Sequence, residues 1–355
     1  MKIVRTILVI LNVLVALGLV LTTLAGEIRP SQSIVPSLLA FAYLPLLAAN
    51  VAMVVVWALL KRWEFLISTA VIALRWSFVG LFFQVGGTTK VPEREEHPQM
   101  VTLMSYNVHM FYGPKDNPAP TDSIAREFLA LVAEYRPDVL CLQEYQAVPK
   151  VNVTDSLMLQ GYNHYHGTHM SNAGAPSGSV VFSKLPITYV SKIDNTKLLV
   201  ELMHDSSRFR VCCIHMDSYQ LDTVEKHEME KLRHGEVKAP SRKTLGKVKE
   251  TILCHEGEWE QRLSPVVTEC SLPLVMAGDL NDIPTSWLYH QISKHMTDTY
   301  REKGVGYCTT YHGGSPKFRI DMVFHSEGMQ TLSYKRIRST VSDHYPVFTA
   351  LELTP

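Results

Sequence analysis

The most constraining feature of this sequence is an apolar stretch near its start that contains no charged side chain. The stretch runs from Ile7 to Ala25, with Lys2 and Arg5 before it. A helix needs about 20 such residues to cross roughly 30 Å of hydrocarbon. The stretch therefore predicts a transmembrane helix over about residues 6–25, and a cleaved signal peptide is the alternative.

Two further apolar stretches follow, and charge bounds or interrupts each of them. One covers about residues 36–60 and stops at Lys61 and Arg62, while the other covers about residues 65–85 with Arg75 near its middle. A guanidinium at the centre of a bilayer costs about 2.5–3.5 kcal/mol on insertion scales. We expect Arg75 to snorkel or to face a polar seam, which gives about three transmembrane helices in all.

The basic residues that flank these stretches predict an orientation. Positively charged flanks stay on the cytoplasmic side of a membrane, and Lys2, Arg5, Lys61 and Arg62 would share that side. Residues 1–85 would then anchor a multi-pass protein in the inner (cytoplasmic) membrane, with the lipid bilayer as partner and the rest of the chain extracytoplasmic. If the third stretch only lies along the interface, the rest of the chain is cytoplasmic instead.

The remainder of the chain is predicted to be a single α/β (α+β) domain. Residues 86–99 are rich in Gly, Pro and charge, which is typical of a linker, so the domain covers residues 100–355. Short runs rich in Val, Ile and aromatic residues predict buried strands, and the spacing in residues 123–135 predicts a helix capped by Thr121 or Asp122. The predicted strands lie near residues 101–106, 139–143, 179–183, 209–215, 274–278, 320–324 and 346–351.

The segment of about residues 221–269 differs from the rest of this domain. It is charged, His-rich and helix-prone, and it carries no strand pattern. We interpret it as an inserted helical hairpin that turns near Ala239, Pro240 and Ser241, and we expect its charges to form a solvated face.

Charge and cysteine content exclude some classes of protein. Residues 1–97 hold eight of the 34 basic and five of the 34 acidic residues, which leaves 26 basic and 29 acidic residues, a net charge of −3, for the rest. This balance disfavours a protein that grips nucleic-acid phosphates. The six cysteines form no CxxC pair, which disfavours a zinc ribbon, while free thiols or a bridge such as Cys254 to Cys270 stay open.

Most of the predicted strands end in a carboxylate, a carboxamide or a histidine. Such strand ends can bring distant side chains into one cleft at the edge of a sheet. The residues are Asn107, Glu144, His215, Asp279, Asn281, Asp321, Asp343 and His344.

A cleft with this composition favours a hard, oxygen-ligated cation. Carboxylates and carboxamides without thiolates suit Mg²⁺, Mn²⁺ or Ca²⁺ better than zinc. The two histidines, His215 and His344, add proton transfer or phosphate contact near neutral pH. A hard metal, an imidazole and a carboxylate are together suited to the attack of water on a phosphate ester.

These segments, in this order, resemble the endonuclease/exonuclease/phosphatase superfamily over about residues 100–352. The resemblance implies a four-layer αββα sandwich of the deoxyribonuclease-like type. It rests on the segments Ser105-Tyr-Asn107, Leu142-Gln-Glu144, Gly178 to Ile187, Ile214-His215-Met-Asp-Ser218, Ala277-Gly-Asp279-Leu-Asn281-Asp282, Arg319-Ile-Asp321-Met-Val-Phe324 and Ser342-Asp343-His344-Tyr-Pro346.

The resemblance also implies a role for each site residue. Glu144 would be the main metal ligand, supported by Asn107 and Asp343. The implied catalytic residues are Asp279 for the attacking water, Asn281 for the water and a phosphate oxygen, His344 for the scissile phosphate, Asp321 to orient His344, and His215 for the leaving group. Some members of the superfamily carry a carboxylate where this chain has His109, so the metal shell would differ here.

The leading hypothesis is a membrane-anchored, metal-dependent hydrolase of a phosphate ester. The net charge of −3 favours a phospholipid headgroup or a small phosphoester over nucleic acid, with an extracytoplasmic nuclease as the alternative. A non-catalytic, membrane-displayed binding module is the lesser alternative.

Overall fold

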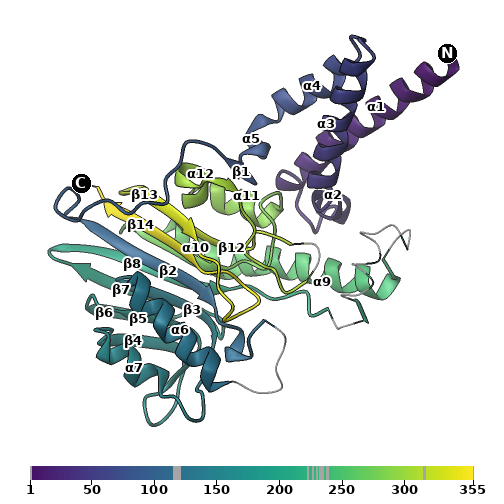
Figure 1. The fold of residues 1–355 in the computed structure, drawn as a ribbon. Coiled ribbons are helices and arrows are strands. Elements are labelled where there is room, and N and C mark those ends of the chain that lie inside the picture. Colours follow the sequence, from purple (N-terminus) through teal and green to yellow (C-terminus); the bar gives the residue numbers. More distant parts are fainter. Residues whose placement is uncertain are drawn as a thin grey trace.

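Two β-sheets packed face to face form the centre of the molecule (Figure 1). The computed structural model describes residues 2–114, 121–221, 240–314 and 317–354, together with residues 224, 225, 228, 231 and 236. Among these residues each of the two main sheets has six strands, mostly antiparallel with one parallel pair in each.

The first sheet has the order β13-β14-β2-β3-β5-β4, in which β2 and β3 are parallel. Its strands are β2 (Met100–Asn107), β3 (Val139–Tyr145), β4 (His164–Met170), β5 (Pro176–Ser183), β13 (Met329–Arg336) and β14 (Val347–Leu353).

The second sheet has the order β10-β12-β9-β8-β7-β6, in which β8 and β9 are parallel. Its strands are β6 (Ile187–Lys192), β7 (Lys197–His204), β8 (Ser207–His215), β9 (Leu274–Asp279), β10 (Thr297–Asp298) and β12 (Asp321–His325).

The alternation of side chains along each strand explains the layers. On β3, Val139 and Cys141 point into the core between the two sheets, whereas Leu140 and Leu142 point outward. The outward face is covered by α6 (Asp122–Tyr135) and α7 (Val153–Leu159). A strand with both faces covered reads as a continuous apolar run, which is why the sequence revealed it.

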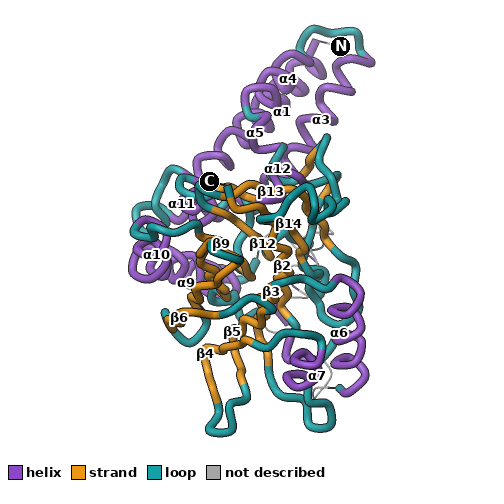
Figure 2. Tube along the Cα trace, turned by 90° about the vertical axis from the view of Figure 1, so that its left-hand side faces the viewer, coloured by secondary structure: helices purple, strands orange, loops and turns teal. Residues whose placement is uncertain are grey.

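Helices cover the outer face of the second sheet as well. Figure 2 shows α6 and α7 on one side of the sandwich and α9, α10 and α11 on the other. These helices are α9 (Arg242–Glu258), α10 (Ser264–Thr268), which follows the short π-helix η3 (Trp259–Leu263), and α11 (Trp287–Ser293). The layer order is helix, sheet, sheet, helix, so the predicted αββα sandwich is confirmed.

The N-terminal region forms a helical bundle that projects from the sandwich (Figure 1). Its elements are α1 (Lys2–Thr22), η1 (Thr23–Gly26), α2 (Ile34–Ala40), α3 (Tyr43–Leu59), α4 (Phe65–Leu74) and α5 (Trp76–Val79).

The prediction of about three transmembrane helices is wrong. In the described part of the chain one helix, Lys2–Gly26, is long and apolar enough to cross a membrane, or two if α2 and α3 count as a single span bent by 61°. The bend has a local cause, since Pro45 has no N–H to offer the carbonyl of Phe41, where the two helices separate. The third stretch fails because α4 ends after ten residues, immediately before Arg75.

The bundle packs against the second sheet and the helices that cover it. Leu19, Tyr43 and Phe82 share one buried cluster with Trp259 and Trp287 of the domain. The segment after α5 adds a strand pairing, because β1 (Phe83–Gln84) lies antiparallel to β11 (Gly306–Tyr307), just after α12 (Thr299–Lys303). The polar segment that follows, residues 86–99, also contacts the domain through the ion pair of Arg94 with Asp138, at 2.6 Å.

The inserted segment is helical in its described second half, whereas most of its first half lies outside the described residues. The expectation that its charges form a solvated face is wrong for α9. His255, Glu256 and Glu258 are each at most 5% exposed, because this face of α9 packs against the sandwich and the N-terminal region. The six cysteines are free, so no bridge joins Cys254 to Cys270.

Candidate active site

The predicted site residues come from strand ends that lie at one edge of the sandwich. In the second sheet His215, at the end of β8, is paired in register with Asp279, at the end of β9. Asp321 begins the antiparallel neighbour β12 and pairs with Asp279 from the other side. Strand β2, which ends at Asn107, contacts β9 across the sandwich, so the ends of both sheets meet here.

Asn107 joins the two sheets through its side-chain amide. Its Nδ2 donates to Oε1 of Glu144 at 3.0 Å and to Oδ2 of Asp279 at 3.1 Å, while its Oδ1 accepts from the backbone N–H of His109 at 3.0 Å. The amide thus meets the two carboxylates with its NH₂ group. For Asn107 to serve as a metal ligand, its side-chain amide would have to rotate by half a turn, so that Oδ1 instead of Nδ2 faces the carboxylates.

The backbone of two site residues is left-handed. Glu144 has φ of 53° and lies at an irregularity of β3 where the register with β5 shifts, and Asn281 has φ of 47°. Non-glycine residues adopt this region rarely and at a cost of about 1–3 kcal/mol. At Glu144 the irregularity directs the side chain out of the ladder and toward Asn107.

His215 faces the same pair of carboxylates from the second sheet. Its Nε2 lies 3.6 Å from Oε1 of Glu144 and 4.0 Å from Oδ2 of Asp279. The side chain is 19% exposed, and its Nε2 has no hydrogen-bond partner among the described residues. An imidazole nitrogen that faces two carboxylates in this way is suited to exchange a proton with a bound group.

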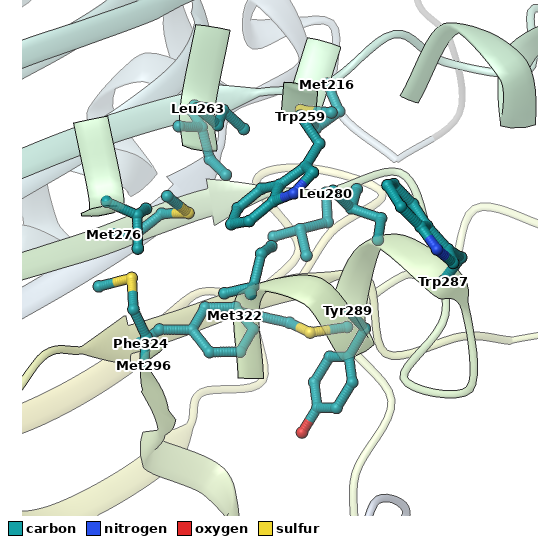
Figure 3. Packing of buried hydrophobic residues seen from close by; sticks show 14 of the residues in the cluster. Met216, Trp259, Leu263, Met276, Leu280, Trp287, Tyr289, Met296, Met322 and Phe324 are labelled. Atoms are coloured by element: carbon teal, nitrogen blue, oxygen red, sulfur yellow. The ribbon is translucent and has the colours of Figure 1, made fainter. Parts of the chain in front are cut away.

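The loop after β9 is held in place by both polar and apolar contacts. The backbone N–H of Asn281 donates to Oδ1 of Asp279 at 2.8 Å, and its side chain donates to the carbonyl of Met216 at 2.9 Å. Between them Leu280 is fully buried, and Figure 3 shows it between the indole rings of Trp259 and Trp287. The orientation of Asp279 and Asn281 therefore depends on the core beneath them.

His344 is a buried imidazole that forms an ion pair with Asp321. Its Nδ1 lies 3.0 and 2.9 Å from the two oxygens of Asp321, and its Nε2 lies 3.7 Å from Oδ2 of Asp279. Burial opposes a charge on this ring, but the negative charges of Asp321 and Asp279 outweigh that effect and raise the pKa of His344 to about 10. Burial also raises the pKa of Asp321, while the charge of His344 opposes that rise.

Asp343 lies at the opening of the same cluster. Its Oδ1 is 3.9 Å from Nε2 of His344 and 3.4 Å from Nδ1 of His109. His109 thus lies against Asp343, at the position where some members of the superfamily carry a carboxylate. The structure brings all eight predicted site residues into one connected set.

The charges of this set fit a divalent cation. Asp321 balances His344, which leaves Glu144, Asp279 and Asp343 without a Lys or Arg partner among the described residues. Asp279, Asp321 and His344 also have ligand atoms within 4.8 Å of one another. Of these two places, the one beside Glu144 suits a hard cation better, because it offers carboxylate oxygens. In the other place, Nδ1 of His344 is already bonded to Asp321.

Two polar neighbours of the site carry no sequence pattern that would reveal them. Oγ1 of Thr310 accepts from the backbone N–H groups of Ile320 and Asp321, at 3.0 and 2.9 Å, and fixes the start of β12. The ring of Tyr311 packs against His344, with 5.0 Å between the ring centroids. His255 of the inserted segment lies behind the site and contacts Asp282, next to Asn281, whereas the charge pattern of that segment predicts a solvated face.

A two-sheet sandwich with a carboxylate, amide and imidazole cluster at one edge is typical of phosphoester hydrolases of the deoxyribonuclease-like class. The model of the Endonuclease/Exonuclease/phosphatase family matches residues 104–217 and 259–344, more than half of the chain, so the chain belongs to this family. Members of the family are hydrolases that act on phosphoester bonds and generally use divalent metals. A second model, described only as a domain of unknown function, matches residues 5–82.

Three solved structures illustrate the similarity of fold. An endonuclease/exonuclease/phosphatase from Beutenbergia cavernae DSM 12333 is 20% identical, with 72% of each chain covered and a TM-score of 0.49. The human Nocturnin catalytic domain with bound sulfate is 14% identical (75% of this chain, 100% of that chain, TM-score 0.48). ANGEL2, a 2′,3′-cyclic phosphatase, is 17% identical (72% and 96%, TM-score 0.48). No curated protein matches the chain.

Proposed function

We propose that this protein is a membrane-anchored, divalent-metal-dependent phosphoesterase that hydrolyses a phospholipid headgroup or a small phosphoester by attack of water. The observation that carries the proposal is the contact of Asn107 with both Glu144 and Asp279, because it joins the metal side of the site to the water-activating side. Membership of a family of phosphoester hydrolases supports the reaction class.

The metal side of the site consists of Glu144, Asp343 and Asn107. Mg²⁺, or Mn²⁺ or Ca²⁺, would be held by these residues and would offset negative charge on the phosphoryl oxygens. Glu144 suits this role because its side chain is 25% exposed, more than the other carboxylates of the set, so it is open to an entering ion.

The remaining residues act on the water and the phosphate. Asp279, 1% exposed and fixed by two amides, would orient the attacking water and accept its proton. The second N–H of the Asn281 amide would hold a phosphate oxygen. His344, kept positively charged by Asp321, would stabilise charge that develops on the phosphate, and His215 would protonate the leaving group.

The helical bundle supports the proposed attachment to a bilayer and the proposed side of the membrane on which the catalytic domain lies. Arg5 at the start of α1 pairs with Glu64, with Nη2 2.5 Å from the carboxylate, so Lys61 and Arg62 lie at the same distal end of the bundle. The domain lies at the other end (Figure 1). With α1 in the membrane and the basic end in the cytoplasm, the catalytic domain would be extracytoplasmic.

Hydrolysis of bis(p-nitrophenyl) phosphate by the full chain in detergent tests the reaction. We expect activity with Mg²⁺ or Mn²⁺ that disappears on addition of EDTA, and a loss of about 10²- to 10⁴-fold in Asp279→Asn, the range of general-base catalysis. Asp205→Asn is the matched control, because that carboxylate is 73% exposed in the turn between β7 and β8. An unmutated protein without metal-dependent activity would contradict the proposal.

A substrate panel then separates the ester classes. Phospholipid vesicles, a mononucleotide and single-stranded DNA are offered to the same preparation. Preference for single-stranded DNA would replace the proposal with a nuclease, and binding of an ester without turnover would replace it with a binding module.

A further inference from the structure

Two loops lie at the candidate site, where β8 and β9 end. The backbone N–H of Met216 still bonds to Asp279 and that of Leu280 to Ile320, each at 2.9 Å, before each loop leaves its sheet. One follows β8 and contains Met216 and Asp217, and the other follows β9 and contains Asn281 and Asp282. The loops contact each other through the Asn281 amide and the Met216 carbonyl, at 2.9 Å. Strand pairing fixes His215 beside Asp279, and the contact between the two loops holds Asn281 close to the residue that follows His215.

His255 of α9 bonds to both loops at once. Its Nε2 lies 2.7 Å from the carbonyl oxygen of Asp217, and its Nδ1 lies 3.3 Å from Oδ2 of Asp282. Both partners offer acceptor oxygens, so the imidazolium form of the ring, in which both nitrogens carry a proton, can donate to the two loops at once. The ring is 1% exposed, so it is buried between the two loops and α9.

The surroundings of the ring favour this charged form. Asp282 is 4% exposed, and its other oxygen accepts from the N–H of Ile283 at 2.8 Å, so it is fixed where it faces the ring. Tyr219 packs edge-on at 6.1 Å between centroids, and Glu258 lies one turn further along α9. Burial would lower the pKa of His255, but Asp282, the Asp217 carbonyl and Glu258 raise it overall.

We propose that His255 is a positioning residue for the reaction, which clamps the loop after His215 to the loop that carries Asn281. The inference rests on the proposed function. The family model leaves residues 218–258 unmatched, so this clamp comes from an insertion of this chain rather than from the part shared with the family. The ring touches neither Asp279 nor His344 and takes no part in proton transfer.

The next residue on the same helix provides a matched control. The carboxylate of Glu256 is 5% exposed and accepts from the backbone N–H of Ser31 at 2.8 Å and from its hydroxyl at 2.7 Å. Glu256 thus bonds to the N-terminal region and not to either loop. Glu256→Gln also replaces a buried polar side chain of α9, but one that faces the N-terminal region instead of the two loops.

The test compares His255→Gln, His255→Ala and Glu256→Gln in the full chain with bis(p-nitrophenyl) phosphate and Mg²⁺. A glutamine donates to only one of the two acceptors, so we expect kcat to fall about 10- to 100-fold, as for residues that orient ligands of a site, with KM unchanged. Glu256→Gln should keep the unmutated kcat. Hydrogen exchange should become faster in peptides that cover residues 214–219 and 279–284 of the His255 variants alone.

The outcomes are distinct. A His255→Gln protein with the unmutated kcat and unmutated exchange overturns the positioning role while the proposed function stands. An equal loss of kcat in Glu256→Gln also overturns it, since the effect would then belong to α9 as a whole. If His255→Ala unfolds, the Gln variant decides. An unmutated protein that is inactive on every substrate refutes the proposed function itself.

Discussion

At the scale of single residues, the site depends on backbone conformations that side chains disfavour. Glu144 and Asn281 are both left-handed, and neither is a glycine. Each of them costs about 1–3 kcal/mol, which the surrounding structure must offset. The hydrogen bonds of Asn107 and Met216 to these two side chains provide part of that compensation. Apolar periodicity cannot reveal such conformations, because it reports only which face is buried.

The ion pair of His344 with Asp321 predicts a pH dependence. The folded pKa of His344, about 10, lies above its unfolded value near 6.5. Its contribution to the free energy of unfolding is therefore complete below about pH 6.5 and is lost as the pH rises through about 10.

Asp321→Asn removes the negative charge closest to the ring, so we expect the pKa of His344 to fall. An NMR titration of the His344 Cε1–H resonance in metal-free protein measures this, with His344→Gln to assign the signal. Asp205→Asn is the control and should leave the titration unchanged, because it is an exposed carboxylate in the β7–β8 turn. A midpoint of His344 that stays the same in Asp321→Asn would contradict the assignment of the raised pKa to this pair.

At the scale of the elements, the close approach of β8 and β9 predicts a strict need for glycine beside Asp279. A Cβ on Gly278 would lie 1.8 Å from the carbonyl oxygen of Ile214, which only a backbone shift could relieve. We expect Gly278→Ala to lower the melting temperature and to abolish hydrolysis. Gly246→Ala, on α9 with nothing within 4 Å, should instead stabilise by about 0.5–1 kcal/mol. Thermal unfolding measures both, and a Gly278→Ala protein of normal stability would contradict the structure.

The same scale shows which elements could be predicted from the sequence. Strands buried on both faces appear as apolar runs, and each predicted run corresponds to an observed strand. The runs missed β4, β6, β10 and β13, which form the edges of the two sheets and are partly exposed. They also missed β7, whose buried Lys197 and Glu201 resemble surface residues until the structure shows Glu258 and Arg210 beside them.

The candidate site follows a similar division. The eight residues at strand ends could be found, because sheet topology brings strand ends together. The support that the site receives from the inserted segment could not be predicted, because His255 belongs to a charged segment whose burial depends on how α9 packs. The third apolar stretch shows the opposite error, because composition alone did not reveal that its helix ends at Arg75.

At the scale of the whole molecule, the bundle covers a large apolar face of the domain. Leu19, Tyr43 and Phe82 pack into the cluster that contains Trp259 and Trp287. We expect a variant without residues 1–82 to bind a dye for exposed apolar surface and to self-associate, because this cluster would face water. Dye fluorescence and light scattering measure this, with the full chain in detergent as the control. A monomeric truncated protein that binds no dye would show that the interface is dispensable.

The proposed orientation predicts the accessibility of the domain. Protease added to intact spheroplasts of a bacterial host should digest residues 100–355, because the basic end of the bundle would lie in the cytoplasm. A cytoplasmic marker protein is the control and should survive. Protection of the domain until the membrane is lysed would place it on the cytoplasmic side.

Ser31 bonds to Glu256, and β1 pairs with β11, so the bundle is joined to the sandwich at two separate places. If the bundle lies in a bilayer, the catalytic edge is held at a fixed height and tilt above the lipid. Encounters with esters in that leaflet would then become a two-dimensional search, whereas esters dissolved in water would reach the candidate site only by ordinary diffusion.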